Sequence, residues 1–274
     1  MITGKTRVYA VIGDPVAHSL SPPMHNAWMA QAGLDAVYVA LQSSSPDFAA
    51  LAASGLAGVN VTVPHKERAA ASAERVDPMA HRLRAANVLR FGPDGAEAFN
   101  TDAPGFIASL AEAYPTWRDE VRTALVLGAG GAARAIAFGL ADAGVARIRI
   151  ANRTPARAAS ACEGLANAET RDWAALDAAF AEADLIVNAT TLGLAGAPSP
   201  DWPVAATQAH AIVADAVYRP LETPLLAASR KHGLRTVDGL GMLIHQGALA
   251  FEIWFGQRPD VQAARRQLQA VLAP

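Results

Sequence analysis

The sequence is poor in cysteine and in long apolar segments. Cys162 is the only cysteine among 274 residues, so the chain can form no internal disulfide, and its surroundings do not resemble those of a thiol nucleophile. No apolar run is long enough to span a bilayer, and residues 1–7 lack the apolar stretch of a secretory signal. These absences predict a cytoplasmic protein.

An excess of one charge is missing as well. The formal net charge is −2 and the isoelectric point is about 6.4, so no global electrostatic attraction to nucleic acid or to an anionic membrane is expected. Apolar residues make up 52% of the chain and charged residues 18%, which is enough apolar material to fill buried cores. The length predicts one large domain or two domains of ordinary size.

Lysine is scarce. Of the 23 basic residues only Lys5, Lys66 and Lys231 are lysines, and the others are arginines. Arginine stays protonated in proteins, whereas lysine can release and regain a proton. Lys5 and Lys231 fit solvated surface charges, but Lys66 directly follows a polar strand end. Lys66 is therefore a candidate for proton transfer.

Short apolar runs rich in β-branched residues alternate with helical stretches, which is typical of an α/β fold. We expect the first hundred residues to form a unit with both parallel and antiparallel strands, and a second unit to begin near Val121. Connections between the units are expected at Pro104-Gly105 and around Tyr114–Trp117. The predicted strands are 7–13, 36–42, 58–63, 87–91, 97–100, 123–127, 147–151, 184–189, 212–217 and 234–237, and the last predicted helices are 242–255 and 261–272.

A glycine-rich turn follows the predicted strand at 123–127. Gly128, Gly130 and Ala133 match the Gly-x-Gly-x-x-Gly/Ala fingerprint of dinucleotide-binding domains. Gly128 permits the tight turn, Gly130 lets the backbone approach a pyrophosphate, and Ala133 allows close packing of helix and strand. The N-terminus of the next helix then faces the anion. Because a strand precedes the motif and a helix follows it, the motif predicts a Rossmann-type site.

The next strand ends without the acidic residue that usually binds the ribose 2′-hydroxyl of NAD. Asn152 and Arg153 stand there instead, and Arg157 follows. Positive charge near a helix N-terminus is unfavourable to the helix dipole, so an anionic ligand such as a 2′-phosphate would explain these arginines. Thr154 is expected to cap the helix that begins at Pro155. The pattern favours NADP as the cofactor.

Polar residues cluster at the strand ends of the first unit, where zinc-ligand spacing, a Ser-His-Asp arrangement and a P-loop are all absent. Ser19 and Ser21 offer hydroxyls at a helix start, which suits a carboxylate, and Ser21 is expected to cap that helix. Asn60 and Thr62 share one face of a strand, and Lys66 follows it. Further polar residues of this kind are Asn87 and Asn100-Thr-Asp102. Ligands of open α/β sheets bind beyond the carboxyl ends of the strands, so we expect these segments to converge.

Eight short motifs occur along nearly the whole chain. They are Ser-Leu-Ser-Pro, Asn-Val-Thr-Val-Pro-His-Lys, Asn-Thr-Asp, Gly-Ala-Gly-Gly-Ala, Asn-Arg-Thr, Asp215-x-x-Tyr218-x-Pro220, Thr223-Pro-Leu-Leu226 and Gly239-Leu-Gly-Met-Leu-Ile-His-Gln246-Gly. Together, and in this order, they resemble the shikimate dehydrogenase family. The resemblance implies an N-terminal α/β substrate domain with a mixed sheet (residues 1–104 and 240–274) and a Rossmann-type NADP domain (residues 105–239), with the active site in the cleft between them.

The resemblance also implies roles for single residues. It makes Lys66 and Asp102 the catalytic pair and requires no metal. The residues implied to hold substrate are Ser19, Ser21, Thr62, Asn87, Tyr218 and Gln246. Those implied to hold NADP are Gly128, Ala129, Gly130, Gly131, Ala132, Asn152, Arg153, Thr154, Arg157, Thr190, Ala216, Gly239 and Met242.

The expected reaction is the reversible reduction of 3-dehydroshikimate to shikimate, by a monomer or homodimer. NADPH supplies the hydride, while Lys66 polarises the ketone and donates the proton, and Asp102 holds Lys66 and a substrate hydroxyl in place. Two departures from the family's usual motifs, Asn87-Val88 and Thr190-Thr191, leave open a relative that acts on quinate or aminoshikimate. A catalytically silent dinucleotide-binding regulator is a third alternative, disfavoured because both catalytic residues are present.

Overall fold

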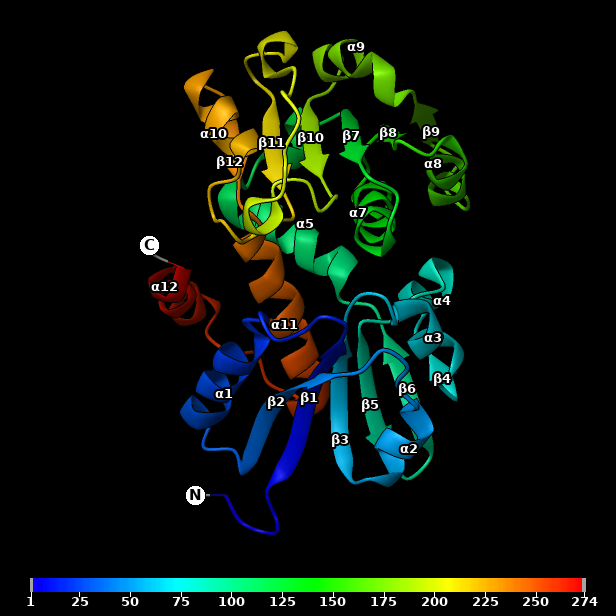
Figure 1. The fold of residues 1–274 in the computed structure, drawn as a ribbon, viewed down its shortest axis with the longest axis vertical. Helices are drawn as coiled ribbons and strands as arrows, with labels where there is room; N and C mark the ends of the chain where they lie inside the picture. The colour runs from blue at the N-terminus through cyan, green and yellow to red at the C-terminus, as the bar shows by residue number, and fades with distance from the viewer. Residues whose placement is uncertain (1, 273–274) are drawn as a thin grey trace. The chain divides into compact units, whose positions relative to one another are not determined.

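The computed structural model describes residues 2–272 and divides into two compact units (Figure 1). The first unit combines the segment that ends at Thr101 with the segment that begins at Gln246, and the second unit runs from Asp102 to His245. Helix α11 (Gly239–Phe255) is divided between the two units, because it starts in the second unit and ends in the first.

The first unit is built on a six-stranded mixed sheet with the order β2-β1-β3-β5-β6-β4. Strands β1, β2 and β3 are parallel, whereas β5 runs antiparallel to both β3 and β6. The strands are β1 (Arg7–Gly13), β2 (Ala36–Gln42), β3 (Leu56–Val61), β4 (Arg75–Val76), β5 (Val88–Gly92) and β6 (Gly95–Phe99). The predicted mixed sheet is thus confirmed, and the sequence did not indicate the short edge strand β4.

Trp254 of helix α11 packs directly against the sheet of the first unit. A side chain on Gly58 in β3 would place its Cβ 2.5 Å from Trp254 Nε1, so only glycine leaves room for the indole. Trp254 Nε1 donates a hydrogen bond of 3.2 Å to the carbonyl of Leu89 in β5. The other helices of this unit are α1 (Ser21–Gln31), α2 (Phe48–Ala53), α3 (Lys66–Ala71), α4 (Pro78–Leu83) and α12 (Val261–Leu272).

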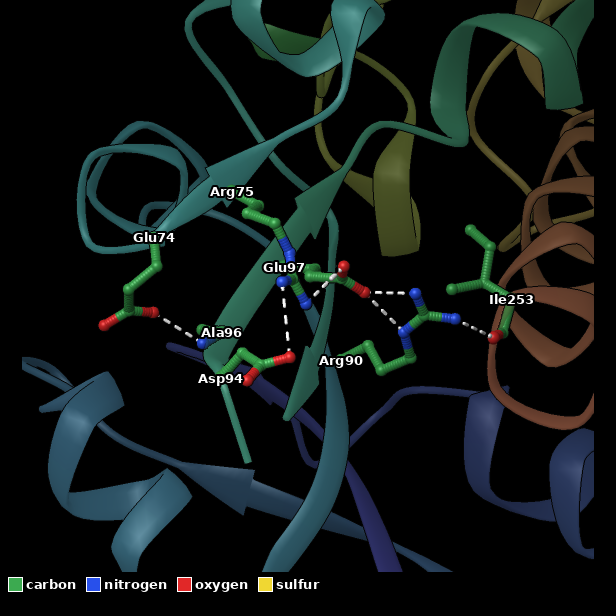
Figure 2. Close-up of polar contacts among 7 residues, drawn as sticks. All are labelled: Glu74, Arg75, Arg90, Asp94, Ala96, Glu97 and Ile253. Carbon is green, nitrogen blue, oxygen red and sulfur yellow. Dashed lines mark hydrogen bonds and ion pairs between the residues drawn. The ribbon is translucent and has the colours of Figure 1, made fainter. Parts of the chain in front are cut away.

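An exposed ion-pair cluster ties the β5–β6 hairpin to its neighbours, as Figure 2 shows. Arg90 pairs with Glu97 across the hairpin and donates a 3.1 Å hydrogen bond to the carbonyl of Ile253 in α11. Arg75 on β4 pairs with the same carboxylate at 2.7 Å. Exposed pairs of this kind add little stability each, but these join three elements at one carboxylate.

The second unit has a six-stranded parallel sheet with the order β12-β11-β10-β7-β8-β9. All residues of β7 and β10 are buried, as expected for central strands covered by helices on both faces. The strands are β7 (Thr123–Leu127), β8 (Arg147–Ala151), β9 (Ala168–Arg171), β10 (Leu185–Asn188), β11 (Ile212–Asp215) and β12 (Arg235–Val237). The strand order reverses between β7 and β10, which is the Rossmann-type topology and confirms that prediction.

The helices of the second unit are α5 (Asp102–Ala113), α6 (Trp117–Glu120), α7 (Gly131–Asp142), α8 (Pro155–Cys162), α9 (Leu176–Ala181), α10 (Pro224–Lys231) and the first part of α11. Short 3₁₀ turns occupy Trp173–Ala175, Leu194–Gly196 and Val204–Ala206. None of the helices in the described residues is both long and apolar enough to cross a membrane.

Two local predictions are wrong. The connection expected at Pro104-Gly105 is instead the interior of α5, which tolerates Pro104 because the first turn of a helix needs no N–H donor there. Ser21 does not cap α1, because Leu20 takes the N-cap position and Ser21 is the first helical residue. The Ser21 hydroxyl therefore makes no cap bond and is hydrogen-bonded to Tyr38 instead.

Candidate active site

The glycine-rich turn has the geometry that the fingerprint predicts. Gly128 has φ +108°, a value that strains residues with a side chain, and a Cβ there would lie 3.0 Å from the carbonyl oxygen of Ala189. Gly130 is the N-cap of α7, and a Cβ placed there would lie in open space. The turn therefore offers backbone N–H groups and free room to a diphosphate.

The remaining predicted cofactor residues follow the carboxyl ends of the strands of the same sheet. Thr190 comes after β10, Ala216 after β11, and Gly239 and Met242 begin α11 after β12. A Cβ on Gly239 would lie 2.5 Å from the carbonyl oxygen of Val217, so these loops are packed closely on one another. The structure thus brings the predicted positions to one edge of the sheet, where dinucleotides bind in this topology.

Two exposed arginines follow β8, Arg153 in the loop and Arg157 in the first turn of α8. Thr154 stands at the N-cap of α8, as predicted, but its side chain makes no capping hydrogen bond. Asn152 Nδ2 holds the loop by donating a 3.0 Å hydrogen bond to the carbonyl of Thr154. Exposed guanidinium groups without a carboxylate in this loop fit a ribose 2′-phosphate, and with the Gly130 turn they fit NADP.

A buried polar network occupies the first unit. The backbone N–H of Ser21 donates to Ser19 Oγ at 3.2 Å, and the side chain of Ser21 is hydrogen-bonded to Tyr38. The Tyr38 hydroxyl donates to Asn60 Oδ1 at 2.6 Å, and Asn60 Nδ2 donates to the carbonyl of Asn87 at 3.2 Å. The helix start at Ser21 is thus connected through β2 to the ends of β3 and β5.

Asn87 extends this network to the second half of the chain. Its Nδ2 donates to Thr101 Oγ1 at 2.8 Å and to Gln246 Oε1 at 3.2 Å, and its Oδ1 accepts from the N–H of Thr101 at 2.7 Å. Of the predicted substrate residues, Ser19, Ser21, Asn87 and Gln246 are therefore connected by hydrogen bonds. Tyr38 and Thr101 were not selected from the sequence. Thr101 lies inside the Asn-Thr-Asp motif, which could have indicated it, whereas nothing local distinguishes Tyr38.

Burial keeps the aromatic part of this network uncharged. The pKa of Tyr38 is raised well above its ordinary value because the phenol is buried, so it remains a hydrogen-bond donor. His25 stacks on Tyr38 with ring centroids 4.4 Å apart and planes 4° from parallel. Burial lowers the pKa of His25 to about 3, and neither of its ring nitrogens has a hydrogen-bond partner. His25 is therefore a neutral packing residue.

Lys66 is the first residue of α3 and is half-buried, and its carbonyl accepts a 2.9 Å hydrogen bond from the N–H of Ala86. Thr62 is also half-buried, and its methyl group stands where a side chain of Gly13 would be. The neighbouring His65 is buried and its Nε2 lies 2.6 Å from the carbonyl oxygen of Ser43, which indicates a structural role.

Asp102 and Tyr218 belong to the second unit. Asp102 opens α5 and is 5% exposed. Tyr218 is half-buried in the loop after β11, and burial raises its pKa. Within residues 2–272 no group of three or more His, Cys, Asp or Glu side chains is placed to hold a metal ion.

Fold and site together define a Rossmann-type dinucleotide-binding protein with an additional α/β unit. Family models match as follows: the shikimate dehydrogenase substrate binding domain matches residues 11–89, shikimate / quinate 5-dehydrogenase matches 111–194, and the shikimate 5′-dehydrogenase C-terminal domain matches 239–269. The chain belongs to the shikimate dehydrogenase family, as its motifs predict.

Individual relatives agree over nearly the full length. The chain is 46% identical to a protein of Rhodospirillum rubrum named Shikimate dehydrogenase (NADP(+)), covering 97% of this chain and 98% of that protein. A crystal structure of shikimate 5-dehydrogenase from Thermus thermophilus with NADP(H) and shikimate is 40% identical with a TM-score of 0.84, covering 95% and 99%. Quinate dehydrogenase from Corynebacterium glutamicum in complex with NAD is 29% identical with a TM-score of 0.90, covering 97% and 99%.

Proposed function

We propose that this chain is an NADP-dependent shikimate dehydrogenase that interconverts 3-dehydroshikimate and shikimate. The observation that carries the proposal is the connected set Ser21, Asn87 and Gln246 in a chain 46% identical to a protein named Shikimate dehydrogenase (NADP(+)). Substrate is held by Ser19, Ser21, Thr62, Asn87, Tyr218 and Gln246. We further propose that it acts in the cytoplasm as a monomer or homodimer and that its two domains are residues 1–104 with 240–274 and residues 105–239.

In this proposal the first unit binds the polar ring substrate through its buried network. Ser19 and Ser21 bind the ring carboxylate, since hydroxyl and backbone N–H donors at a helix start suit an anion. Asn87 and Gln246 bind ring hydroxyl groups. Because these side chains already hold one another by hydrogen bonds, little rotational freedom is lost when substrate binds.

Lys66 moves the proton in the proposed reaction. NADPH, when bound, supplies the hydride that reduces the ketone. Lys66 as an ammonium polarises the ketone oxygen and gives it a proton, and as a neutral amine it takes the proton back in the reverse direction. Asp102 accepts a hydrogen bond from a substrate hydroxyl and holds Lys66. Arg153 and Arg157 bind the 2′-phosphate, and the other predicted positions around Gly130 bind the rest of the cofactor.

A second candidate is a preference for quinate, because a quinate dehydrogenase is similar in structure with a TM-score of 0.90, although a shikimate dehydrogenase in complex with NADP⁺ has the same TM-score. The two candidates separate in a steady-state panel of purified protein with shikimate and quinate, each with NADP⁺ and NAD⁺. We expect the highest kcat/KM for shikimate with NADP⁺. A higher value for quinate contradicts the substrate assignment, and no turnover of either substrate would leave a relative that acts on aminoshikimate or a dinucleotide-binding regulator.

A further inference from the structure

A buried carboxylate lies at the predicted cofactor edge of the second unit and has no role in the proposed reaction. Asp215 is the last residue of β11 and is 2% exposed. Three donors surround it: Asn188 Nδ2 at 3.0 Å, the N–H of Val217 at 2.9 Å and Thr223 Oγ1 at 2.7 Å. Burial raises the pKa of Asp215 to about 6, although all three donors favour the charged form. Near neutral pH Asp215 therefore acts as an anionic acceptor.

The partners of Asp215 belong to neighbouring loops. Asn188 ends β10, lies opposite Asp215 in the strand register and is completely buried. Its Oδ1 accepts from the N–H of Thr190 at 3.1 Å and from Thr190 Oγ1 at 2.6 Å. Leu192 N–H in turn donates to Thr190 Oγ1 at 3.1 Å. The carboxylate thus fixes the orientation of the Asn188 side chain, and Asn188 fixes the conformation of the loop that contains Thr190.

The same carboxylate shapes the loop after β11. Its bond to the N–H of Val217 lies between Ala216 and Tyr218, and its bond to Thr223 fastens the far end of the loop. Thr223 also caps α10 by accepting from the N–H of Leu226 at 3.3 Å. The Asp215 side chain therefore restrains the loops that contain Thr190, Ala216 and Tyr218.

We propose that Asp215 is a positioning residue that holds the β10 and β11 loops in the conformation that binds cofactor and substrate. This proposal rests on the proposed function, in which Thr190 and Ala216 hold NADP and Tyr218 holds substrate. It assigns Asp215 no contact with either ligand. Its removal should weaken binding more than it slows the chemical step, because Lys66 and the hydride donor are unchanged.

The test compares Asp215→Ala with Asp215→Asn. Asparagine keeps an oxygen for Asn188 and Val217, and its amide can donate to Thr223, whose hydroxyl also accepts. Alanine leaves all three donors without their acceptor. We expect Asp215→Ala to raise KM for both NADPH and 3-dehydroshikimate roughly tenfold with kcat changed less than about threefold, and Asp215→Asn to restore most of the loss. Wild-type KM values in a folded Asp215→Ala enzyme would overturn the proposal.

Two measurements keep the test decisive. Calorimetric titration with NADP⁺ alone reports binding without turnover, so a defect there supports the positioning role even if the assigned substrate is wrong. Thr223→Val removes the bond to Asp215 together with the cap bond from Leu226, and it decides the matter if Asp215→Ala does not fold. A KM increase of about threefold supports the proposal, and unchanged KM values contradict it. Ser229→Ala is the matched control, since its buried hydroxyl donates only to Leu225 in α10, and we expect unchanged KM values.

Discussion

The hydroxyl of Tyr38 joins Asn60 Oδ1 at 2.6 Å and is also hydrogen-bonded to Ser21, so β2 supplies the link between a helix start and the end of β3. Ser21 and Asn60 are 39 positions apart in the sequence. The link fixes the direction of the Ser21 hydroxyl before any substrate binds.

Replacement of Tyr38 by phenylalanine tests this link. The change removes one hydroxyl and leaves Ser21 and Asn60 short of a partner, which costs about 1–3 kcal/mol for a buried polar group. We expect KM for shikimate to rise by roughly fivefold or more and kcat to fall less. The control is Tyr114→Phe, which removes a hydroxyl bonded to Thr236 in the second unit and should leave both constants unchanged. Equal kinetic effects of the two variants would speak against the link.

Replacement of His25 by phenylalanine should stabilise the protein. The neutral imidazole is completely buried and its two nitrogens have no hydrogen-bond partners, so an aromatic hydrocarbon of similar shape avoids a desolvation cost of about 1–3 kcal/mol. Urea unfolding of both proteins at neutral pH gives the difference in free energy. The exposed His232 provides the control variant His232→Phe, with no gain expected. A loss of stability in His25→Phe would mean that the pocket cannot accept the larger ring.

His25 also predicts a pH dependence of stability. Its pKa is about 3 in the folded protein and about 6.5 when unfolded, so the unfolded chain binds the extra proton between these values. Stability is therefore present above pH 6.5 and is lost as the pH falls towards 3, with a slope of at most about 1.4 kcal/mol per pH unit from this group. In His25→Phe the decline below pH 6.5 should be shallower. Parallel curves for the two proteins between pH 6.5 and 4 would exclude His25 as the cause.

Loss of the Lys66 amine should remove most turnover. General acid–base catalysis contributes about 10²–10⁴-fold, so we expect a fall of this size in kcat for Lys66→Ala while NADP⁺ still binds. Lys66→Arg should fail in a similar way, because arginine keeps the charge but cannot exchange the proton. Lys231→Ala, which changes an exposed lysine of α10, is the control. Near-normal turnover in Lys66→Ala would remove Lys66 from the mechanism.

Arg153 should determine the choice of cofactor. A charge-assisted hydrogen bond to a 2′-phosphate contributes about 1.5–3 kcal/mol, so Arg153→Ala should raise KM for NADPH by roughly tenfold or more. KM for NADH, which lacks that phosphate, serves as the internal control and should hardly change. Equal use of both cofactors by the wild-type protein would contradict the assignment.

The sequence alone determined the parts that depend on local signals. Strands β2, β7 and β8 and helix α12 have the predicted bounds, because their apolar patterns and flanking turn residues act over a few positions. Gly128 and Gly130 marked the dinucleotide turn, because the positive φ of Gly128 favours glycine and the absence of a side chain at Gly130 leaves open space for a diphosphate. The run of family motifs identified the family.

Only the tertiary structure decided how distant residues pair. Ser21 looked like a helix cap, yet its hydroxyl bonds to Tyr38, and Asp215 reaches Asn188 through the register of two parallel strands. Such pairs depend on which strands are neighbours and on which side chains are buried without water. The local propensities of the sequence show neither which strands are neighbours nor which side chains are buried. A polar side chain needs a hydrogen-bond partner within the protein only once the folded sheets have buried it.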